Sequence, residues 1–182
     1  LAAHPNFVYI VLGATHPALV REQGERYRLT LERLARDLRI GRHVIFYNRF
    51  VELTELTEFI RAADVYVTPY LNPAQITSGT LAYSFGCGKA IVSTPYWHAE
   101  ELLADGRGVL VPFADSAALA REIGGLLGDE PRRTAMCAHA YRLGRDMIWA
   151  RSAERYMESF QRTRLGRQDQ PARLDLRAGR VD

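Results

Sequence analysis

Runs of apolar residues alternate with amphipathic segments along most of this 182-residue chain. The run at 6–13, NFVYIVLG, is continuous and ends in glycine, a pattern typical of a β-strand buried on both faces. Runs rich in valine or isoleucine predict further strands at 43–48, 64–70, 90–94 and 107–112. The remaining periodicity predicts helices at about 18–39, 55–63, 78–86, 99–105, 116–129 and 131–161.

Strands separated by helices predict the α/β class, with a doubly wound parallel sheet. We expect five parallel strands in one sheet, with helices on both faces, forming a single Rossmann-like domain over residues 1–161. In the long helix at about 18–39, the apolar residues recur at helical spacing, so this stripe is expected to face the sheet. The stripe consists of Tyr27, Leu31, Leu34 and Leu38.

The formal net charge of +3 comes from the end of the chain. Residues 162–182 contain six arginines and three aspartates, so 6 − 3 = +3 and the rest of the chain is neutral. We interpret 162–182 as a disordered basic tail without a function of its own, and expect no nucleic-acid partner. The longest apolar run is far shorter than the roughly 20 residues of a membrane span, and nothing indicates membrane association of the parent protein. The two cysteines, Cys87 and Cys137, are isolated, which favours a reducing, cytoplasmic location.

Several small hydroxylic residues lie where the third predicted strand gives way to a helix. A helix that begins at Ser78 directs the amides of Ser78, Gly79 and Thr80 outward, where their partial positive charge suits a phosphate. Gly79 allows close approach, and the hydroxyls of Thr77, Ser78 and Thr80 add donors. The alternative is that Ser78 only caps its helix, and the local sequence leaves both interpretations open.

Other site chemistries find little support in the sequence. His98 and Glu100 form no complete zinc-deaminase motif, because the downstream P-C-x-x-C is missing. No second cluster supplies further ligands, so no metal site is predicted, and the acidic pair Glu100 and Glu101 is expected to complement a helix dipole. Neither a G-x-S-x-G nor a G-x-G-x-x-G motif is present.

The segments GCGKAIVSTPYWHAEEL and GRGVLVPFADSAALAREI, together with the apolar runs before them, resemble a known family. From about residue 5 to 127 the chain is similar to the C-terminal, donor-binding domain of the retaining group 1 glycosyltransferases of the GT-B fold. The resemblance implies transfer of a sugar from a nucleotide-diphosphate sugar, which is a substrate, with no cofactor and no obligatory metal. It assigns donor-sugar binding to Gln75, Thr77, Ser78 and Gly79, and nucleotide binding to Thr80, Tyr83 and Glu101. It identifies no catalytic residue.

Two features depart from the family pattern. The family carries two glutamates spaced E-x7-E, and the matching positions here are Gln75 and Tyr83. Gln75 can still hydrogen-bond a sugar, and Tyr83 offers a phenolic oxygen to the ribose unless it turns inward as a core aromatic. The chain also begins after the place where the family's first strand of this domain carries a phosphate-binding basic pair, and it contains no N-terminal acceptor-binding domain.

We therefore expect the donor-binding half of a glycosyltransferase, whose partners are a nucleotide-sugar donor and the missing acceptor domain. The chain alone is expected to be inactive, because positioning the acceptor can account for roughly 7–11 kcal/mol of a reaction barrier. The alternative is a non-catalytic module that binds a nucleotide sugar or another protein through a degenerate site. The sequence does not identify the sugar, the base or the acceptor.

Overall fold

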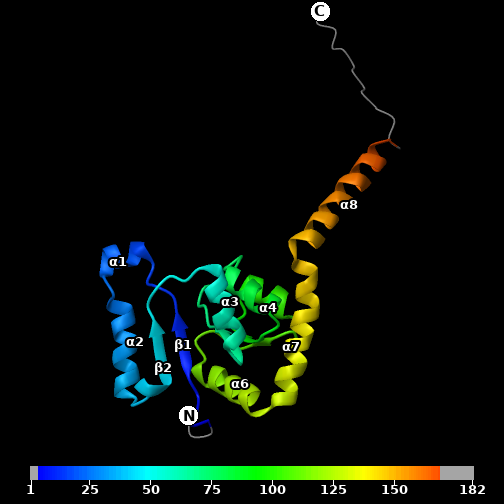
Figure 1. The fold of residues 1–182 in the computed structure, drawn as a ribbon. Helices are drawn as coiled ribbons and strands as arrows, with labels where there is room; N and C mark the ends of the chain where they lie inside the picture. The colour runs from blue at the N-terminus through cyan, green and yellow to red at the C-terminus, as the bar shows by residue number, and fades with distance from the viewer. Residues whose placement is uncertain (1–3, 169–182) are drawn as a thin grey trace, which may run out of the picture.

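The computed structural model describes residues 4–168, which alternate strands and helices as expected (Figure 1). In chain order the elements are β1 (Tyr9–Leu12), α1 (Pro17–Gln23), α2 (Arg26–Asp37), η1 (Gly41–His43), β2 (Val44–Tyr47), α3 (Leu53–Ala62), β3 (Val65–Thr68), α4 (Gly79–Gly86), β4 (Ala90–Ser93), α5 (Trp97–Leu103), β5 (Val109–Leu110), α6 (Ser116–Gly128), α7 (Glu130–Gly144), η2 (Arg145–Met147) and α8 (Trp149–Gln168). The α/β class and the parallel strand pairing are confirmed.

The strands form two separate hydrogen-bonded groups. β1 pairs with β2, and β4 lies between β3 and β5; all three pairings are parallel. Within residues 4–168 no pairing joins β1 to β3, so the prediction of one continuous five-stranded sheet is wrong. The larger group, with its helices, and the β1–β2 unit, with α1 and α2, lie side by side (Figure 1).

β4 is the centre of the hydrophobic core. All four of its residues are buried, because successive side chains of a strand point to opposite faces and both faces are covered. Ile91 packs on one side with residues of α4, α5 and α7, and Ala90 and Val92 pack on the other with residues of α6 and α7. This half of the molecule therefore has the two-sided packing expected of a doubly wound sheet.

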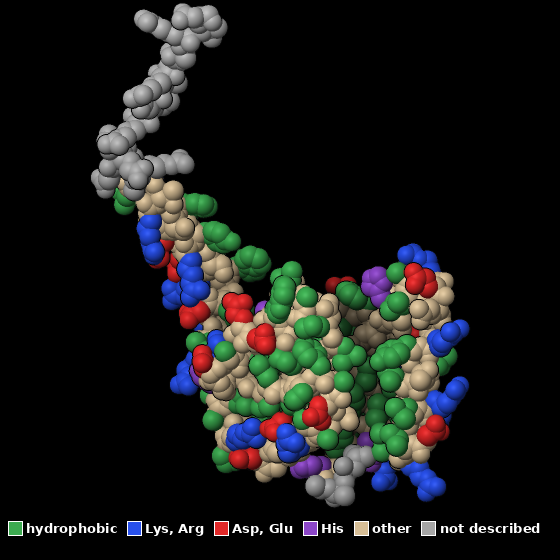
Figure 2. Space-filling model, turned by 180° about the vertical axis from the view of Figure 1, so that it is seen from behind, with side chains coloured by type: hydrophobic (Ala, Val, Ile, Leu, Met, Phe, Trp, Pro, Cys, Tyr) green, Lys and Arg blue, Asp and Glu red, His purple; other side chains and the backbone are tan. Residues whose placement is uncertain are grey.

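The β1–β2 unit is packed less completely. Val8 and Ile10 are 50% and 44% exposed, and Ile45, which pairs with Ile10, is 41% exposed. The prediction that the strand at 6–13 is buried on both faces is therefore wrong for this structure. Seen from behind, the molecule is hollowed between the part with β1 and β2 and the rest, and hydrophobic side chains follow the hollow (Figure 2).

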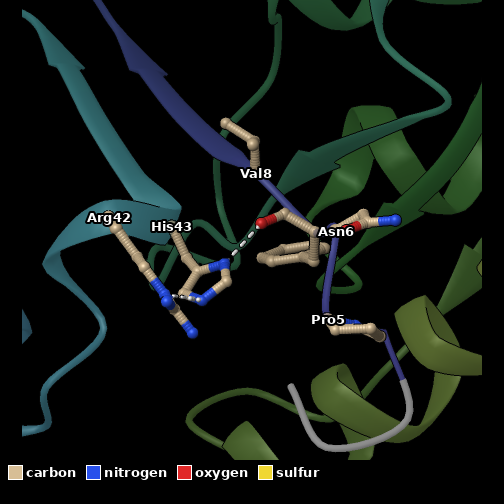
Figure 3. A pocket seen from close by; sticks show the side chains of 6 residues that line it. Pro5, Asn6, Val8, Arg42 and His43 are labelled. Carbon is tan, nitrogen blue, oxygen red and sulfur yellow. Dashed lines mark hydrogen bonds between the residues drawn. The ribbon is translucent and has the colours of Figure 1, made fainter.

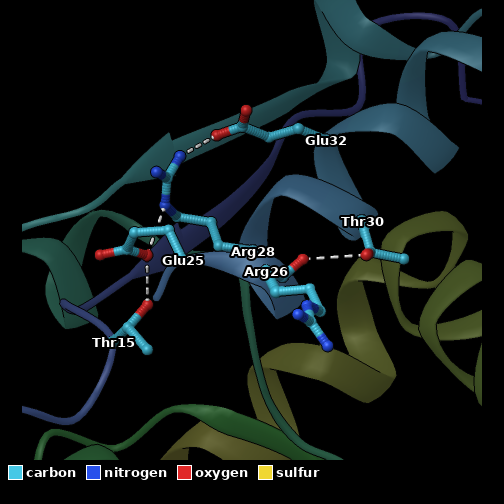
Figure 4. A network of polar contacts seen from close by, with 6 residues as sticks. All are labelled: Thr15, Glu25, Arg26, Arg28, Thr30 and Glu32. Atoms are coloured by element: carbon cyan, nitrogen blue, oxygen red, sulfur yellow. Dashed lines mark hydrogen bonds and ion pairs between the residues drawn. The ribbon is translucent and has the colours of Figure 1, made fainter. Parts of the chain in front are cut away.

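The predicted helix at 18–39 is divided in two at Gly24, whose φ of 62° interrupts helical geometry. Directly after the break, the Glu25 carboxylate accepts hydrogen bonds from the Thr15 hydroxyl (2.7 Å) and from Arg28 Nε (3.0 Å) (Figure 4). The Thr15 hydroxyl, and then the Arg28 guanidinium, lower the pKa of Glu25. These contacts hold the start of α2 to the loop that follows β1.

The expected apolar stripe of this helix is only partly confirmed. Tyr27, Leu34 and Leu38 are exposed, whereas Ala35 is the buried residue of α2. Leu31 is half-buried. The small β1–β2 unit offers too little surface to cover the whole stripe.

The CGK turn between α4 and β4 joins three elements. Gly88 has a φ of 70° and lies against α7, where an added Cβ would be 2.8 Å from Tyr141 Cβ. The next residue, Lys89, donates from Nζ to the carbonyl oxygens of Arg61 (2.6 Å) and Ala63 (2.8 Å) at the end of α3. Lys89 therefore caps α3, because the last carbonyls of a helix lack partners within it.

α8 projects from the body as a single helix (Figure 1). It continues to Gln168, so the domain boundary expected at 161 falls inside the helix and residues 162–168 extend it. The remainder of the expected disordered tail, 169–182, lies outside the described residues. No helix in the described part of the chain is long and apolar enough to cross a membrane.

Candidate functional site

The candidate site lies at the carboxyl edge of the β3–β4–β5 sheet. The chain leaves β3 at Thr68 and reaches α4 through an irregular segment, 69–78, while β4 leads directly to α5. Both helices therefore begin at the edge where ligands bind in doubly wound sheets.

Ser78 is the N-cap of α4. Its Oγ accepts a hydrogen bond from the Leu81 amide (3.3 Å), and the residue is buried. Its own amide donates to Nδ1 of His98 on α5 (2.9 Å). The capping interpretation therefore holds for the Ser78 side chain, and the Ser78 amide is not available to a ligand.

The next two amides remain available. Gly79 and Thr80 occupy the first turn of α4, and nothing in residues 4–168 accepts a hydrogen bond from their N–H groups. Gly79 is exposed, and a Cβ added there would meet only the Tyr83 ring, at 4.0 Å. A phosphate or a sugar hydroxyl can therefore approach two free donors at the positive end of a helix dipole.

A clasp between the 69–78 segment and α5 shapes this helix start. The Trp97 amide donates to the Pro73 carbonyl (3.1 Å), and the His98 amide donates to the Gln75 carbonyl (3.4 Å). These bonds use the first amides of α5, so the N-terminus of α5 binds the loop and these amides are not available to a ligand. With the bond from Ser78 to His98, α5 is bonded to the N-cap of α4 once and to the loop before it twice.

Gln75 turns its side chain toward its own loop. Its Nε2 donates one N–H to the Thr77 carbonyl (2.6 Å), which leaves Oε1 as an acceptor and the second N–H of Nε2 as a donor. The Thr77 side chain is exposed beside it. At this position the glutamine supplies an acceptor and one remaining donor but carries no charge.

Tyr83 lies on the same face of α4 as Gly79 and is 43% exposed. The contact between its ring and the Gly79 position follows from i, i+4 spacing, since helical side chains lean toward the N-terminus. Tyr83 is therefore not a core aromatic, which settles the alternative that the sequence left open. Its phenol is exposed to solvent near the free amides.

Glu101 is exposed on α5. Its backbone carbonyl accepts from the Arg107 guanidinium (3.0 Å), and no hydrogen bond in the described chain joins its carboxylate to the start of α4. The structure thus brings together residues 75, 77–80 and 83, and leaves Glu101 apart from them.

Buried hydroxyl groups form hydrogen bonds at the ends of β3 and β4, next to the loops of the site. The Tyr96 hydroxyl donates to Thr68 Oγ1 (3.3 Å), which in turn donates to Ser93 Oγ (2.8 Å). The same core holds Tyr66, and burial raises the pKa of its phenol to about 12, so this group stays neutral. These bonds tie the ends of β3 and β4 together beneath the loops.

Sequence reasoning missed the role of His98. No local sequence pattern indicates that His98 accepts a hydrogen bond from the N-cap of α4, because the histidine and that amide are 20 residues apart. Within the described residues no group of three or more His, Cys, Asp or Glu side chains could hold a metal ion.

Two surface hollows accompany the sheet. A small one of about 170 Å³ lies at the carboxyl ends of β3, β4 and β5, where Pro69, Thr94 and Pro112 line it. The larger, about 450 Å³, lies at the opposite end, beside Val8 and His43 at the start of β1 (Figure 3). Because it is at the amino edge of the strands, the larger hollow is separate from the candidate site.

Comparison with known proteins identifies the family. A family model described as "Glycosyl transferases group 1" matches residues 6–129. The chain belongs to the group 1 glycosyltransferases. Among solved structures, the C-terminal domain of a group 1 glycosyl transferase, LpcC of Francisella tularensis, matches 77% of this chain and 69% of that one, with a TM-score of 0.65 and 20% identity. The resemblance to a C-terminal domain of the GT-B fold is therefore confirmed.

Other members of this family are considerably longer. D-inositol 3-phosphate glycosyltransferase 2 of Catenulispora acidiphila is 33% identical over 138 residues, 72% of this chain and 31% of that protein. A GDP-mannose-dependent phosphatidylinositol monomannoside mannosyltransferase of Mycolicibacterium smegmatis is 31% identical over 65% of this chain and 32% of its own. HepE of Anabaena, solved with UDP, matches 89% of this glycosyltransferase chain and 43% of that one, with a TM-score of 0.74 and 17% identity. The chain thus spans about a third of the curated relatives it matches.

Proposed function

We propose that this chain is the donor-binding half of a glycosyltransferase that moves a sugar from a nucleotide-diphosphate sugar to an acceptor. The observation that carries the proposal is the exposed start of α4, where the amides of Gly79 and Thr80 have no acceptor within the described chain. Diphosphates bind well at such helix starts, because the free N–H groups and the dipole favour negative charge.

Each neighbouring residue has a place in the proposed site. Gln75 Oε1 and the Thr77 hydroxyl face the donor sugar, and Ser78 holds the helix start in position. The Thr80 hydroxyl and the Tyr83 phenol serve the nucleotide. Glu101 joins the nucleotide site only if its own side chain turns toward the start of α4.

The structural neighbours support a nucleotide-sugar donor. HepE of Anabaena was solved with UDP, with UDP and glucose, and with UDP-glucose. For this chain we propose the same class of donor, and we leave its base and sugar to be determined by titration with uridine, guanosine and adenosine diphosphate sugars. An acceptor domain outside the chain completes the enzyme, and the chain alone binds donor weakly and transfers nothing.

Gly79→Val tests the site. Because the added branches would crowd the two free amides, we expect nucleotide-diphosphate affinity to fall at least tenfold, with little change in stability. Isothermal titration calorimetry and thermal unfolding measure the two quantities. Gly41→Val is the matched control: a Cβ at Gly41 meets nothing within 4 Å, so it too can be added without a clash, but Gly41 lies on η1, between α2 and β2. Equal affinity in both folded variants would refute the site.

A second candidate function is a non-catalytic nucleotide-sugar-binding module. It is favoured by Gln75, whose amide is engaged by its own loop, and by Tyr83, since both stand where the family pattern has a glutamate. Both functions use the same pocket, so they differ in turnover: sugar transfer by the chain joined to its acceptor domain supports the enzyme, whereas donor binding without transfer supports the module.

Tyr83→Glu tests whether the nucleotide pocket is retained. A carboxylate accepts both ribose hydroxyl protons, so we expect affinity to rise by about 1 kcal/mol, roughly fivefold. Tyr83 is exposed, so the stability should stay within about 0.5 kcal/mol. The control Tyr27→Glu, at another exposed tyrosine on α2, should leave binding unchanged. No gain in affinity would mean that the ribose site is lost.

A further inference from the structure

The imidazole of His98 lies between the starts of two helices. Its Nδ1 accepts a hydrogen bond from the amide of Ser78, the N-cap of α4 (2.9 Å), and the His98 amide donates to the Gln75 carbonyl (3.4 Å). His98 is the second residue of α5 and is half-buried. Bonds from both its side chain and its backbone therefore hold this residue beside the segment that leads into α4.

The bond to Ser78 determines where the imidazole carries its hydrogen. A backbone N–H can only donate, so Nδ1 must accept, and a neutral histidine then has its hydrogen on Nε2. In an imidazolium, Nδ1 would also carry a hydrogen, and two donors would face each other across 2.9 Å. His98 is therefore a neutral side chain whose Nε2–H is a donor.

This Nε2–H group has no acceptor in the described part of the chain. The buried polar side-chain atom that lacks a partner there is Ser84 Oγ, so His98 Nε2 is not buried and a ligand can reach it. His43 differs, because its Nδ1 donates to the Phe7 carbonyl (2.8 Å) and its Nε2 accepts from Arg42 (3.0 Å) (Figure 3). Both nitrogens of His43 are thus used within the protein, whereas His98 keeps one donor free.

Three donors near the start of α4 have no acceptor in the part of the chain that the structure describes. They are the amides of Gly79 and Thr80 and the Nε2–H of His98, on the far side of a ring that is bonded to Ser78. None of the three groups can accept a hydrogen bond. A sugar hydroxyl both donates and accepts, whereas the ionised oxygens of a diphosphate only accept, so this set of groups matches a diphosphate better.

We propose that His98 is a ligand-binding residue of the nucleotide site, and that its Nε2–H donates to an oxygen of the donor's diphosphate beside the Gly79 and Thr80 amides. This role rests on the proposed function and deepens it, because it names a side chain that the diphosphate contacts. Hydrogen bonds to charged oxygens are stronger than those between neutral groups, so the imidazole contributes to affinity as well as to the position of Ser78.

Imidazole NMR with inorganic pyrophosphate tests this role on the 182-residue chain, labelled with ¹⁵N at histidine. We expect His98 to show the Nε2–H tautomer without ligand, and its Nε2–H signal to shift and to exchange more slowly with water as pyrophosphate is added. His16 is the matched control, because its Nδ1 likewise accepts a backbone N–H, that of Ala18 (3.2 Å), but at the start of α1. An Nδ1–H tautomer at His98, or an equal response at His98 and His16, overturns the proposal.

His98→Asn removes the donor and keeps the acceptor. The asparagine Oδ1 can take the place of Nδ1 toward Ser78, but the side chain is too short to place an N–H where Nε2 lies. We expect His98→Asn to be more stable than His98→Ala, yet to bind pyrophosphate at least about threefold more weakly than the unaltered chain, because one hydrogen bond is lost. Urea unfolding and isothermal titration calorimetry measure the two quantities. Unchanged affinity in folded His98→Asn contradicts the proposal.

The same NMR titration separates this role from the proposed function. Shifts at the Gly79 and Thr80 amides without a response at His98 Nε2 leave the donor site in place and refute the role of His98. No shift at any of the three groups refutes the site itself. A response of His98 to a nucleotide-diphosphate sugar but not to pyrophosphate places the sugar at the imidazole, and this also overturns the proposed contact with the diphosphate.

Discussion

Gly88→Ala is expected to lower the free energy of unfolding by about 2–5 kcal/mol. Two costs combine: a side chain in the left-handed region costs about 1–2 kcal/mol, and overpacking against a fixed neighbour costs about 1–3 kcal/mol. The Gly88 φ is 70°, and the added Cβ would lie 2.8 Å from Tyr141 Cβ and 3.1 Å from the Cys137 carbonyl oxygen. Because these are atoms at or next to the α7 backbone, α7 itself must move. Urea unfolding followed by circular dichroism measures the loss.

Gly106→Ala separates the two costs. Gly106 has nearly the same φ, 74°, but nothing lies within 4 Å of its added Cβ. We expect this control to lose only the conformational cost, about 1–2 kcal/mol. If Gly88→Ala is no worse than Gly106→Ala, then α7 does not pack against the CGK turn as described.

His98→Ala is expected to cost about 1–3 kcal/mol of stability and to weaken nucleotide-diphosphate binding at least fivefold. Removal of the imidazole leaves the amide of Ser78, the buried N-cap, without its acceptor at 2.9 Å. An unsatisfied buried donor carries a penalty of this size. The N-cap of α4 then loses its hydrogen bond to α5, so the Gly79 and Thr80 amides are held less firmly. Chemical unfolding and calorimetric titration measure the two effects.

Two further variants make the His98 result specific. His98→Asn retains an acceptor near the position of Nδ1 and should recover part of both losses. Glu100→Ala, on the same helix and exposed, should change stability by less than about 0.5 kcal/mol. If His98→Ala behaves like Glu100→Ala, the histidine does not position the site.

Local pattern was sufficient to find the strands and the start of α4. The apolar runs located β1 to β5 within a few residues, and the Ser78–Gly79 pair indicated a capped helix start. Gly24 marked a break that the periodic stripe around it concealed, because helical spacing says nothing about a φ of 62°. The apolar pattern at 6–13 also favoured burial of Val8 and Ile10, since the sequence of an apolar strand does not show whether another element covers it.

The sequence by itself determined the α/β class, the parallel strands and the capped start of α4, because hydrophobic periodicity and capping act over a few residues. Only the tertiary structure decided which donors stay free. The bond from Ser78 to His98 and the clasp between Pro73 and Trp97 join segments 20 or more residues apart, and no local pattern encodes them. The exposure of Tyr83 and of Val8 and Ile10 was likewise decided by packing, because burial depends on what the rest of the fold places beside a residue.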